Sequence, residues 1–349
     1  MNSIPKMRKK IIEGLFPNGV PRLWCPLLTH YRDDGSIDFD RMSRHFNHLL
    51  PVVRGYLLPG STGDAWVLDE TQTLQVADFA VGLAHKYGVP LLLGVLQRDT
   101  ETMIRTISAM LGEDVRKLRR NDLAQILKAK HILGFTFCPP TGKALAQSEI
   151  TAGLSTILDL GLPTALYQLP QVTESEIEPE TFAELTKRYA NLIFLKDSSG
   201  DDRIALSAFD KEGIFMIRGA EGDYARWLSD AGGPYNGFLL STANCFAREL
   251  HEVIERLESG DREKAQEISN RLTIATNSVF ALVKPLPYGN AFTNANKAID
   301  HFFAFGPDAI KKDRPMLHAK VRLPADIIEA TRDILVQCRL MPQKGYLES

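Results

Sequence analysis

The 349-residue sequence lacks most features of secreted, zinc-binding or membrane proteins. Its four cysteines, Cys25, Cys138, Cys245 and Cys338, lie far apart and form no CxxC pair, so neither a disulfide framework nor a cysteine-based zinc site is expected. No apolar run approaches the roughly 18 residues that a membrane-spanning helix needs. The basic N-terminal segment leads into a stretch interrupted by Glu, Pro and Gly, unlike a signal peptide. We therefore expect a protein of the reducing cytoplasm without a membrane partner.

An excess of charge is also missing. Lys plus Arg (41) nearly balances Asp plus Glu (43), whereas a nucleic-acid-binding surface would favour a basic composition. The sequence contains no GK[ST] phosphate loop and no GxSxG nucleophile elbow. His45 and His48 lie three residues apart, but no carboxylate follows at a metal-binding spacing. These absences predict a small-molecule partner and give no indication of a nucleic acid, a metal or a cofactor.

Short apolar segments that end in Gly, Pro or polar residues recur along the sequence. Most are continuously apolar rather than alternating, which is typical of parallel strands covered on both faces. Helical patterns fill most of the gaps, and eight β-then-α units in about 250 residues have the size of one (β/α)8 TIM barrel. The eight expected strands lie within residues 21–29, 53–60, 89–96, 132–140, 163–170, 191–197, 213–220 and 235–242.

The pattern becomes purely helical after the last expected strand. We expect residues 1–244 to form the barrel and residues 245–349 to form a C-terminal helical extension. Between the third and fourth strands, a long charged stretch has room for two helices where one would suffice. A helical insertion is therefore expected near residues 105–130.

Polar residues at the strand ends are the first candidates for an active site, because TIM-barrel sites lie at the carboxyl ends of the strands. Lys196 ends the sixth strand in "FLKDSSGD". Desolvation could lower the pKa of such an amine and let it form a Schiff base with a carbonyl. The alternative is a solvated strand end or a partner of Asp197. Tyr167, late on the fifth strand, is either a proton shuttle or an ordinary buried tyrosine.

A second candidate follows the expected second strand in "GSTGD". Ser61 and Thr62 carry hydroxyls and lie next to Gly63, and glycines let the backbone turn tightly and present its N–H groups. Such a nest suits a carboxylate or a phosphate. The alternative is an ordinary capped turn between a strand and a helix.

Taken together, the strand ends resemble the dihydrodipicolinate synthase and N-acetylneuraminate lyase family of class I, Schiff-base-forming aldolases and lyases. The motifs that carry the resemblance occur in the family's order and cover most of the chain. They are "PLLTHYRDDGSIDFD", "GSTGD", "YQLP", "LKDSSGD", "RGAEGD", "GFLLSTAN" and "NANKAIDHFFAFG".

The resemblance implies a role for each candidate. Lys196 would form an imine with pyruvate or another 2-oxo acid, and Tyr167 would shuttle protons. The protonated imine would act as an electron sink for making or breaking a C–C bond with an aldehyde, without a metal. Family members are commonly tetramers built from dimers, so a homo-oligomer is expected. The implied substrate-binding residues are Ser61, Thr62 and Gly63 at the carboxylate, with Gly219 and Leu239 lining the pocket through their backbones.

Several positions depart from the family pattern. Val172 stands where dihydrodipicolinate synthases have an arginine that binds the second substrate's carboxylate, and a neutral side chain cannot replace that charge. Cys138 lies where the family commonly has an aromatic pair with a relay tyrosine. Asp64 replaces the usual Glu, which we expect to affect only local hydrogen bonding. With Phe135 and Phe137 nearby, the sequence favours a less charged second substrate.

The expected function is therefore that of a Schiff-base-forming lyase or aldolase, acting on pyruvate or another 2-oxo acid and on an aldehyde. One alternative is a sugar-acid dehydratase that uses the same imine. The other is a catalytically silent homologue that binds a 2-oxo acid.

Overall fold

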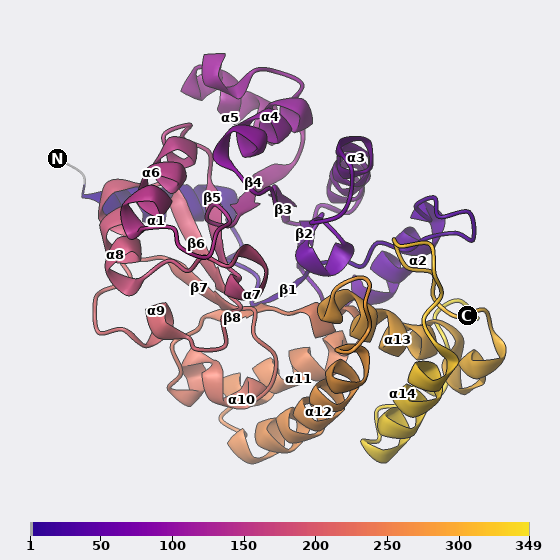
Figure 1. The fold of residues 1–349 in the computed structure, drawn as a ribbon. Helices are drawn as coiled ribbons and strands as arrows, with labels where there is room; N and C mark the ends of the chain where they lie inside the picture. The colour runs from indigo at the N-terminus through magenta and orange to yellow at the C-terminus, as the bar shows by residue number, and fades with distance from the viewer. Residues whose placement is uncertain (1–2, 349) are drawn as a thin grey trace.

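Eight parallel strands close into a barrel in the order β1 to β8. The structure, a computed structural model, describes residues 3–348, and Figure 1 shows the barrel with its helices around it. All eight strands fall within the predicted segments, which confirms the predicted fold class. The strands are β1 (Leu23–Cys25), β2 (Gly55–Leu58), β3 (Leu91–Gly94), β4 (Ile132–Phe137), β5 (Thr164–Gln168), β6 (Leu192–Asp197), β7 (Phe215–Arg218) and β8 (Gly237–Leu239).

Helices cover the outside of the barrel, and side-chain caps fix the ends of several of them. Asp69 caps α3 by accepting a hydrogen bond from the N–H of Gln72, and the helix ends at Gly88, whose φ of 63° suits glycine. The helices are α1 (Ile4–Leu15), α2 (Phe39–Leu49), α3 (Glu70–Tyr87), α4 (Thr100–Leu111), α5 (Arg120–Ala129), α6 (Gln147–Leu158), α7 (Pro170–Thr173), α8 (Pro179–Arg188), α9 (Arg203–Leu206), α10 (Tyr224–Trp227), α11 (Ala247–Glu258), α12 (Arg262–Val283), α13 (Ala291–Phe305) and α14 (Ala325–Gln337). Short 3-10 turns are η1 (Ser61–Gly63), η2 (Val115–Lys117), η3 (Ser229–Ala231), η4 (Ser241–Asn244) and η5 (Gly306–Lys311).

The barrel interior is layered along the strands. Ala165 and Phe194 are paired neighbours on β5 and β6 and belong to one hydrophobic cluster. Tyr167 and Lys196, also paired, lie two residues further along. Because side chains alternate in a strand, they share the interior face with the layer below. The lower cluster comprises Phe16, Trp24, Leu57, Leu92, Ala165, Ile193, Phe194, Ile217 and Leu239.

Helix α1 was not predicted from the basic N-terminal sequence. Its side chain Arg8 is fully buried and donates hydrogen bonds to the carbonyl oxygens of Leu192 at 2.6 Å and Tyr189 at 2.9 Å. After the helix, the ring of Phe16 lies 5.4 Å from that of Phe194 between centroids. The basic segment therefore anchors to the start of β6 and supports the layer beneath Lys196.

Two groups of helices extend beyond the simple barrel pattern. Helices α4 and α5 both lie between β3 and β4, and Figure 1 shows them projecting at the top of the molecule. After β8, the helices α12, α13 and α14 gather at the lower right of the same view. No helix within residues 3–348 is long and apolar enough to cross a membrane.

Candidate active site

Lys196 is a buried amine within the barrel. It is the penultimate residue of β6 and is only 3% exposed, so it is not a solvated strand end. Its Nζ lies 3.9 Å from the centroid of the Tyr167 ring. The carboxylate of Asp197 is hydrogen-bonded to Ser199: its Oδ1 accepts from the N–H and the hydroxyl of that residue. Lys196 therefore projects toward Tyr167 at the carboxyl end of the strands.

Burial lowers the pKa of Lys196 to about 7, while Cys138, Glu221 and Cys25 act in the opposite direction. Burial also raises the pKa of both thiols, so they stay protonated at neutral pH. Of the three opposing groups, Glu221 is therefore the one that supplies negative charge. A large fraction of Lys196 is a neutral, nucleophilic amine under physiological conditions.

Glu221 is held rigidly beside the site. Its Oε1 accepts from the hydroxyl of Ser241 at 2.6 Å and from the N–H of Thr242 at 3.1 Å. Its Oε2 accepts from the hydroxyls of Thr242 at 2.6 Å and Tyr224 at 2.9 Å. Four donors fix a carboxylate whose charge acts on Lys196. Glu221 lies in the motif "RGAEGD" but was not predicted as a site residue; its position just after the seventh strand was the available signal.

Tyr167 is 3% exposed and sits directly beside Lys196 in the sheet register. Burial raises the pKa of its phenol, and the hydroxyls of Ser198 and Ser61 oppose that effect. The phenol is therefore protonated at neutral pH and can donate to a substrate oxygen. The Oγ atoms of Ser61 and Ser198 are themselves buried and have no partner of good hydrogen-bond geometry among residues 3–348.

The "GSTGD" segment forms the buried turn η1 at the end of β2. A Cβ at Gly63 would lie 2.6 Å from the carbonyl oxygen of Leu27, so no larger residue fits there. The hydroxyl of Thr29 donates to the Gly63 carbonyl at 2.7 Å. Asp64 then turns the chain with a φ of 66°, in the left-handed region. The N–H groups of Gly63 and Asp64 donate to the carbonyls of Gly60 at 2.9 Å and Ser61 at 3.2 Å, whereas those of Ser61 and Thr62 donate to no backbone carbonyl among residues 3–348. These two leading N–H groups suit the turn to an anion.

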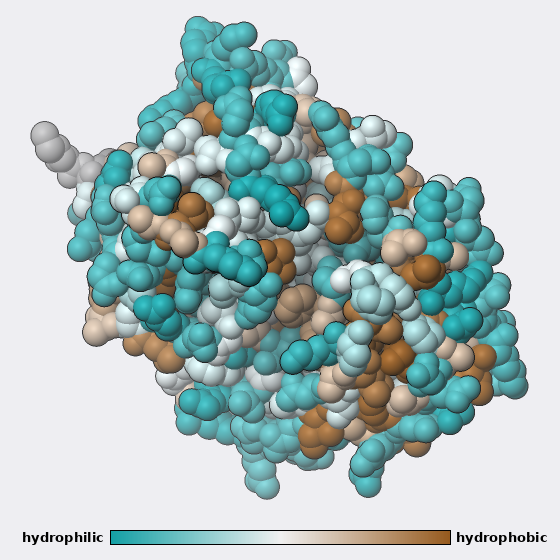
Figure 2. All heavy atoms as spheres, in the orientation of Figure 1, coloured by the Kyte–Doolittle hydropathy of each residue, from teal (hydrophilic) through white to brown (hydrophobic). Residues whose placement is uncertain are grey.

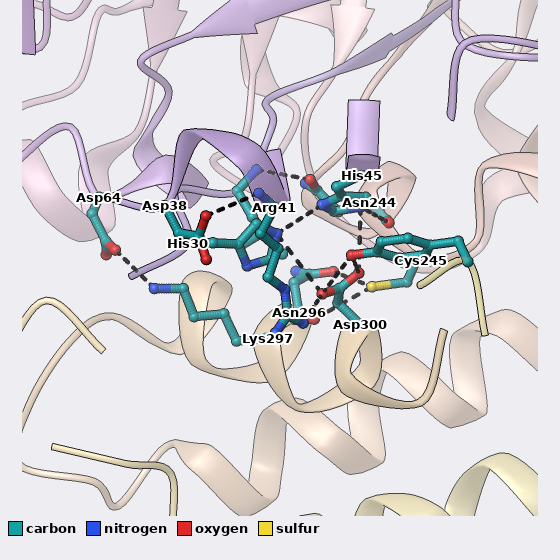
Figure 3. A network of polar contacts seen from close by, with 12 residues as sticks. His30, Asp38, Arg41, His45, Asp64, Asn244, Cys245, Asn296, Lys297 and Asp300 are labelled. Atoms are coloured by element: carbon teal, nitrogen blue, oxygen red, sulfur yellow. Dashed lines mark hydrogen bonds and ion pairs between the residues drawn. The ribbon is translucent and has the colours of Figure 1, made fainter. Parts of the chain in front are cut away.

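Helix α13 clamps this turn from the far end of the chain. Asn290 donates to the Ser61 carbonyl at 3.2 Å, and Thr293 donates to the Thr62 carbonyl at 2.9 Å. The fully buried Lys297 forms an ion pair with Asp64 at 3.2 Å, seen at the left of Figure 3. The Asp64 carboxylate thus pairs with a lysine 233 residues away in the sequence. That Asp in place of Glu affects only local hydrogen bonding stays a prediction.

Gly219 and Leu239 lie in different layers of the site. The N–H of Gly219 donates to the Asp197 carbonyl at 2.6 Å, and a Cβ at this position would lie 2.9 Å from Cε of Lys196. The glycine thus leaves room for the lysine. The side chain of Leu239 belongs to the lower hydrophobic cluster. A contact of either backbone with substrate stays a prediction.

An uncharged wall adjoins Tyr167. Phe135 and Phe137 are not part of it: both side chains belong to the large core outside the barrel, so their suggested influence on the second substrate was wrong. The wall comprises Ala65, Leu96, Cys138, Tyr167 and Leu169, with the partly buried Trp66, Val172 and Phe292 packed against them. Val172 and Cys138, the two departures from the family pattern, therefore lie together.

A polar network lies behind the turn that holds Asp64 (Figure 3). His30 and His45 are hydrogen-bonded at 3.0 Å, and Asp300 lies close enough that the three could hold a metal ion. However, Arg41 forms an ion pair with Asp300 at 3.0 Å, and the hydroxyl of Tyr346 donates to Asp300 at 3.0 Å. These contacts satisfy the carboxylate and place a cation beside it, so we assign no metal here. Sequence spacing could not reveal this cluster, because Asp300 comes from α13.

Two hollows on the surface lie away from the Lys196–Tyr167 pair. One of about 340 Å³ lies between α2 and α11, near His48 and Arg248. Another of about 580 Å³ lies beside α1, near Lys9 and Phe215. Neither hollow is lined by Lys196 or Tyr167.

Comparison with known proteins extends the likeness from motifs to the whole fold. The model of the Dihydrodipicolinate synthetase family matches residues 121–293, which include Tyr167 and Lys196. The 4-hydroxy-tetrahydrodipicolinate synthase of Methanospirillum hungatei JF-1 is 25% identical over 288 residues, or 80% of this chain and 88% of that protein.

Two solved structures share the architecture at lower identity. One is a prophage protein of the dihydrodipicolinic acid synthase family from E. coli K12, in complex with pyruvate; its TM-score is 0.70 at 17% identity, covering 91% of this chain and 98% of that one. The other is KD(P)GA from T. tenax, with a TM-score of 0.68 at 15% identity, covering 91% of this chain and 99% of that one.

Proposed function

The chain is a divergent member of the dihydrodipicolinate synthase and N-acetylneuraminate lyase family, and we propose that it is a Schiff-base-forming lyase or aldolase acting on pyruvate or a related 2-oxo acid. The observation that carries the proposal is the buried Lys196 amine, with a pKa of about 7, beside the phenol of Tyr167. A neutral amine next to a proton donor is what attack on a ketone requires.

In the proposed reaction, Nζ of Lys196 attacks the ketone carbon of pyruvate, and the ketone oxygen leaves as water after protonation through Tyr167. Loss of a proton from the methyl group gives an enamine, with the iminium nitrogen taking up the electron pair. The enamine carbon adds to an aldehyde carbon, and the aldehyde oxygen takes a proton. Water then hydrolyses the iminium, releasing a 4-hydroxy-2-oxo acid and the free amine. Cleavage is the reverse.

The remaining site groups have complementary roles in this scheme. The carboxylate of the 2-oxo acid binds in the η1 turn, where the buried hydroxyl of Ser61 and the Thr62 side chain are available. Gly63 contributes by letting the turn close, because its own N–H donates to the Gly60 carbonyl at 2.9 Å. The fixed carboxylate of Glu221 offsets the positive charge of the iminium at Lys196.

The exposed hydrophobic residues and the free cysteines bear on the oligomeric state and the cellular location. We infer a homo-oligomer, a dimer or tetramer, because hydrophobic residues gather over α12 and α13 in Figure 2 and Ile274 on α12 is 57% exposed. We also infer a cytoplasmic location, which the four free cysteines support.

Exchange of the pyruvate methyl protons with D₂O, followed by NMR, tests the proposal without knowledge of the aldehyde. Enamine formation predicts catalysed exchange in the native chain. Lys196→Met should abolish exchange, whereas Lys211→Met, a lysine outside the site, should leave it unchanged. Absence of exchange in the native protein would leave only a silent binding homologue. Release of an aldehyde from a 4-hydroxy-2-oxo acid then separates a lyase from a dehydratase, which would release water.

A further inference from the structure

The uncharged wall adjoins the place where the enamine would form, because it includes Tyr167, whose ring centroid lies 3.9 Å from Nζ of Lys196. Its residues lie at or just after the carboxyl ends of β2 to β5, except Phe292, which comes from α13. Trp66, Val172 and Phe292 are only partly buried and so form the solvent-facing edge of the wall, which we call its mouth, whereas Leu96 and Cys138 are buried. None of the eight residues carries a charge at neutral pH, since burial raises the pKa of Cys138 and of Tyr167.

Two further observations bear on what occupies this mouth. Nε1 of Trp66 is buried and has no hydrogen-bond partner among residues 3–348. A buried N–H without a partner is costly, so an incoming ligand that offers an acceptor would be favoured. On the other side of Lys196, Glu221 supplies a fixed negative charge that disfavours a second anion.

The buried cations nearby are already engaged. Lys297 is paired with Asp64, and Arg41 is paired with Asp300. Lys196 itself is consumed as the imine. A carboxylate or phosphate on the second substrate would therefore lose its hydration beside Val172 without gaining a buried cation. Flat, apolar groups instead fit between aromatic side chains such as Trp66 and Phe292.

We propose that the second substrate is an uncharged aldehyde with an aromatic or similarly flat apolar body, held between Trp66, Val172 and Phe292. This inference rests on the proposed function and specifies its substrate class. The bond made is between the enamine carbon of pyruvate and the aldehyde carbon. The aldehyde oxygen receives its proton from Tyr167, and hydrolysis of the iminium returns the lysine.

A matched pair of probes tests the proposal. Benzaldehyde and 4-carboxybenzaldehyde differ by one carboxylate, and the aldol product with pyruvate is quantified for each by chromatography. We expect kcat/KM to be at least about tenfold higher for benzaldehyde. Val172→Arg should reverse or abolish that preference by adding a cation at the mouth. Trp66→Ala should lower kcat/KM for benzaldehyde about tenfold or more, whereas Trp66→Phe should lose less.

Two controls separate the possible failures. Val67→Ala changes a neighbouring side chain that is 51% exposed and lies outside the wall, and it should leave both aldehydes unaffected. Pyruvate proton exchange, measured in each variant, reports imine and enamine formation alone. Loss of exchange in the native chain would overturn the proposed function. Intact exchange together with equal use of both aldehydes, a preference for the charged one, or use of neither would overturn only the aromatic-aldehyde assignment.

Discussion

The rate at which pyruvate forms an imine with Lys196 should rise about tenfold between pH 6 and pH 8 and then level off. With a pKa of about 7, roughly a tenth of the amine is neutral at pH 6 and roughly nine tenths at pH 8. A lysine with the ordinary pKa of 10.5 would instead show about a hundredfold rise over the same interval, without a plateau. The two pKa values therefore predict pH–rate profiles that differ in slope and in whether a plateau is reached.

Rapid mixing with pyruvate, quenching into borohydride and intact-mass analysis give this rate at each pH. The variant Glu221→Gln tests whether the charge of Glu221 contributes to the pKa of Lys196. Because Glu221 raises the pKa of Lys196, its neutralisation should move the midpoint to lower pH. A hundredfold rise without a plateau in the native chain, or a midpoint that moves upward in Glu221→Gln, would refute the reasoning.

Three other substitutions have defined outcomes. Tyr167→Phe should still form the imine but slow methyl-proton exchange by about 10² or more, which NMR in D₂O would measure; equal exchange would remove Tyr167 from the mechanism. Lys297→Met should destabilise the chain by about 3–5 kcal/mol and raise KM for pyruvate, because it leaves the buried Asp64 carboxylate without a cation, with only the Tyr31 hydroxyl donating to it; urea unfolding should show partial recovery in the double variant with Asp64→Asn. Lys196→Met should be more stable than the native chain at pH 6. The pKa of Lys196 is lower in the folded chain than in the unfolded chain, so burying the protonated amine lowers the free energy of unfolding by an amount of order 5 kcal/mol below pH 7. This destabilisation fades as pH rises toward 10.5. A stability difference between Lys196→Met and the native chain that does not change with pH would contradict this.

The strands and the candidate site residues that could be predicted are those marked by a short run of consecutive residues. Lys196 and Tyr167 end continuously apolar segments, and parallel strands bring such ends to one rim. The η1 turn has its glycine where a Cβ would strike the Leu27 carbonyl. Each of these signals lies within a few consecutive residues. The positions of the strands and of Lys196, Tyr167 and the η1 turn could therefore be predicted without knowledge of long-range contacts.

The features that were missed depend on long-range contacts or on side-chain direction. Lys297 reaches Asp64, and Asp300 reaches His45, only because α13 packs behind the η1 turn. The direction of Phe137 could not be read, because an apolar strand covered on both faces shows no alternation. Trp66 lies beyond the turn motif, where neither periodicity nor motif spacing indicated that it would border the uncharged wall.

The most direct test of the account is to identify the residue that pyruvate modifies. The native protein is incubated with pyruvate, reduced with borohydride, and digested for peptide mass mapping, with Lys196→Arg treated in parallel. We expect one reduced pyruvyl adduct per chain, located on Lys196, and none in the variant. An adduct on another lysine, or one that persists in Lys196→Arg, would contradict the central claim.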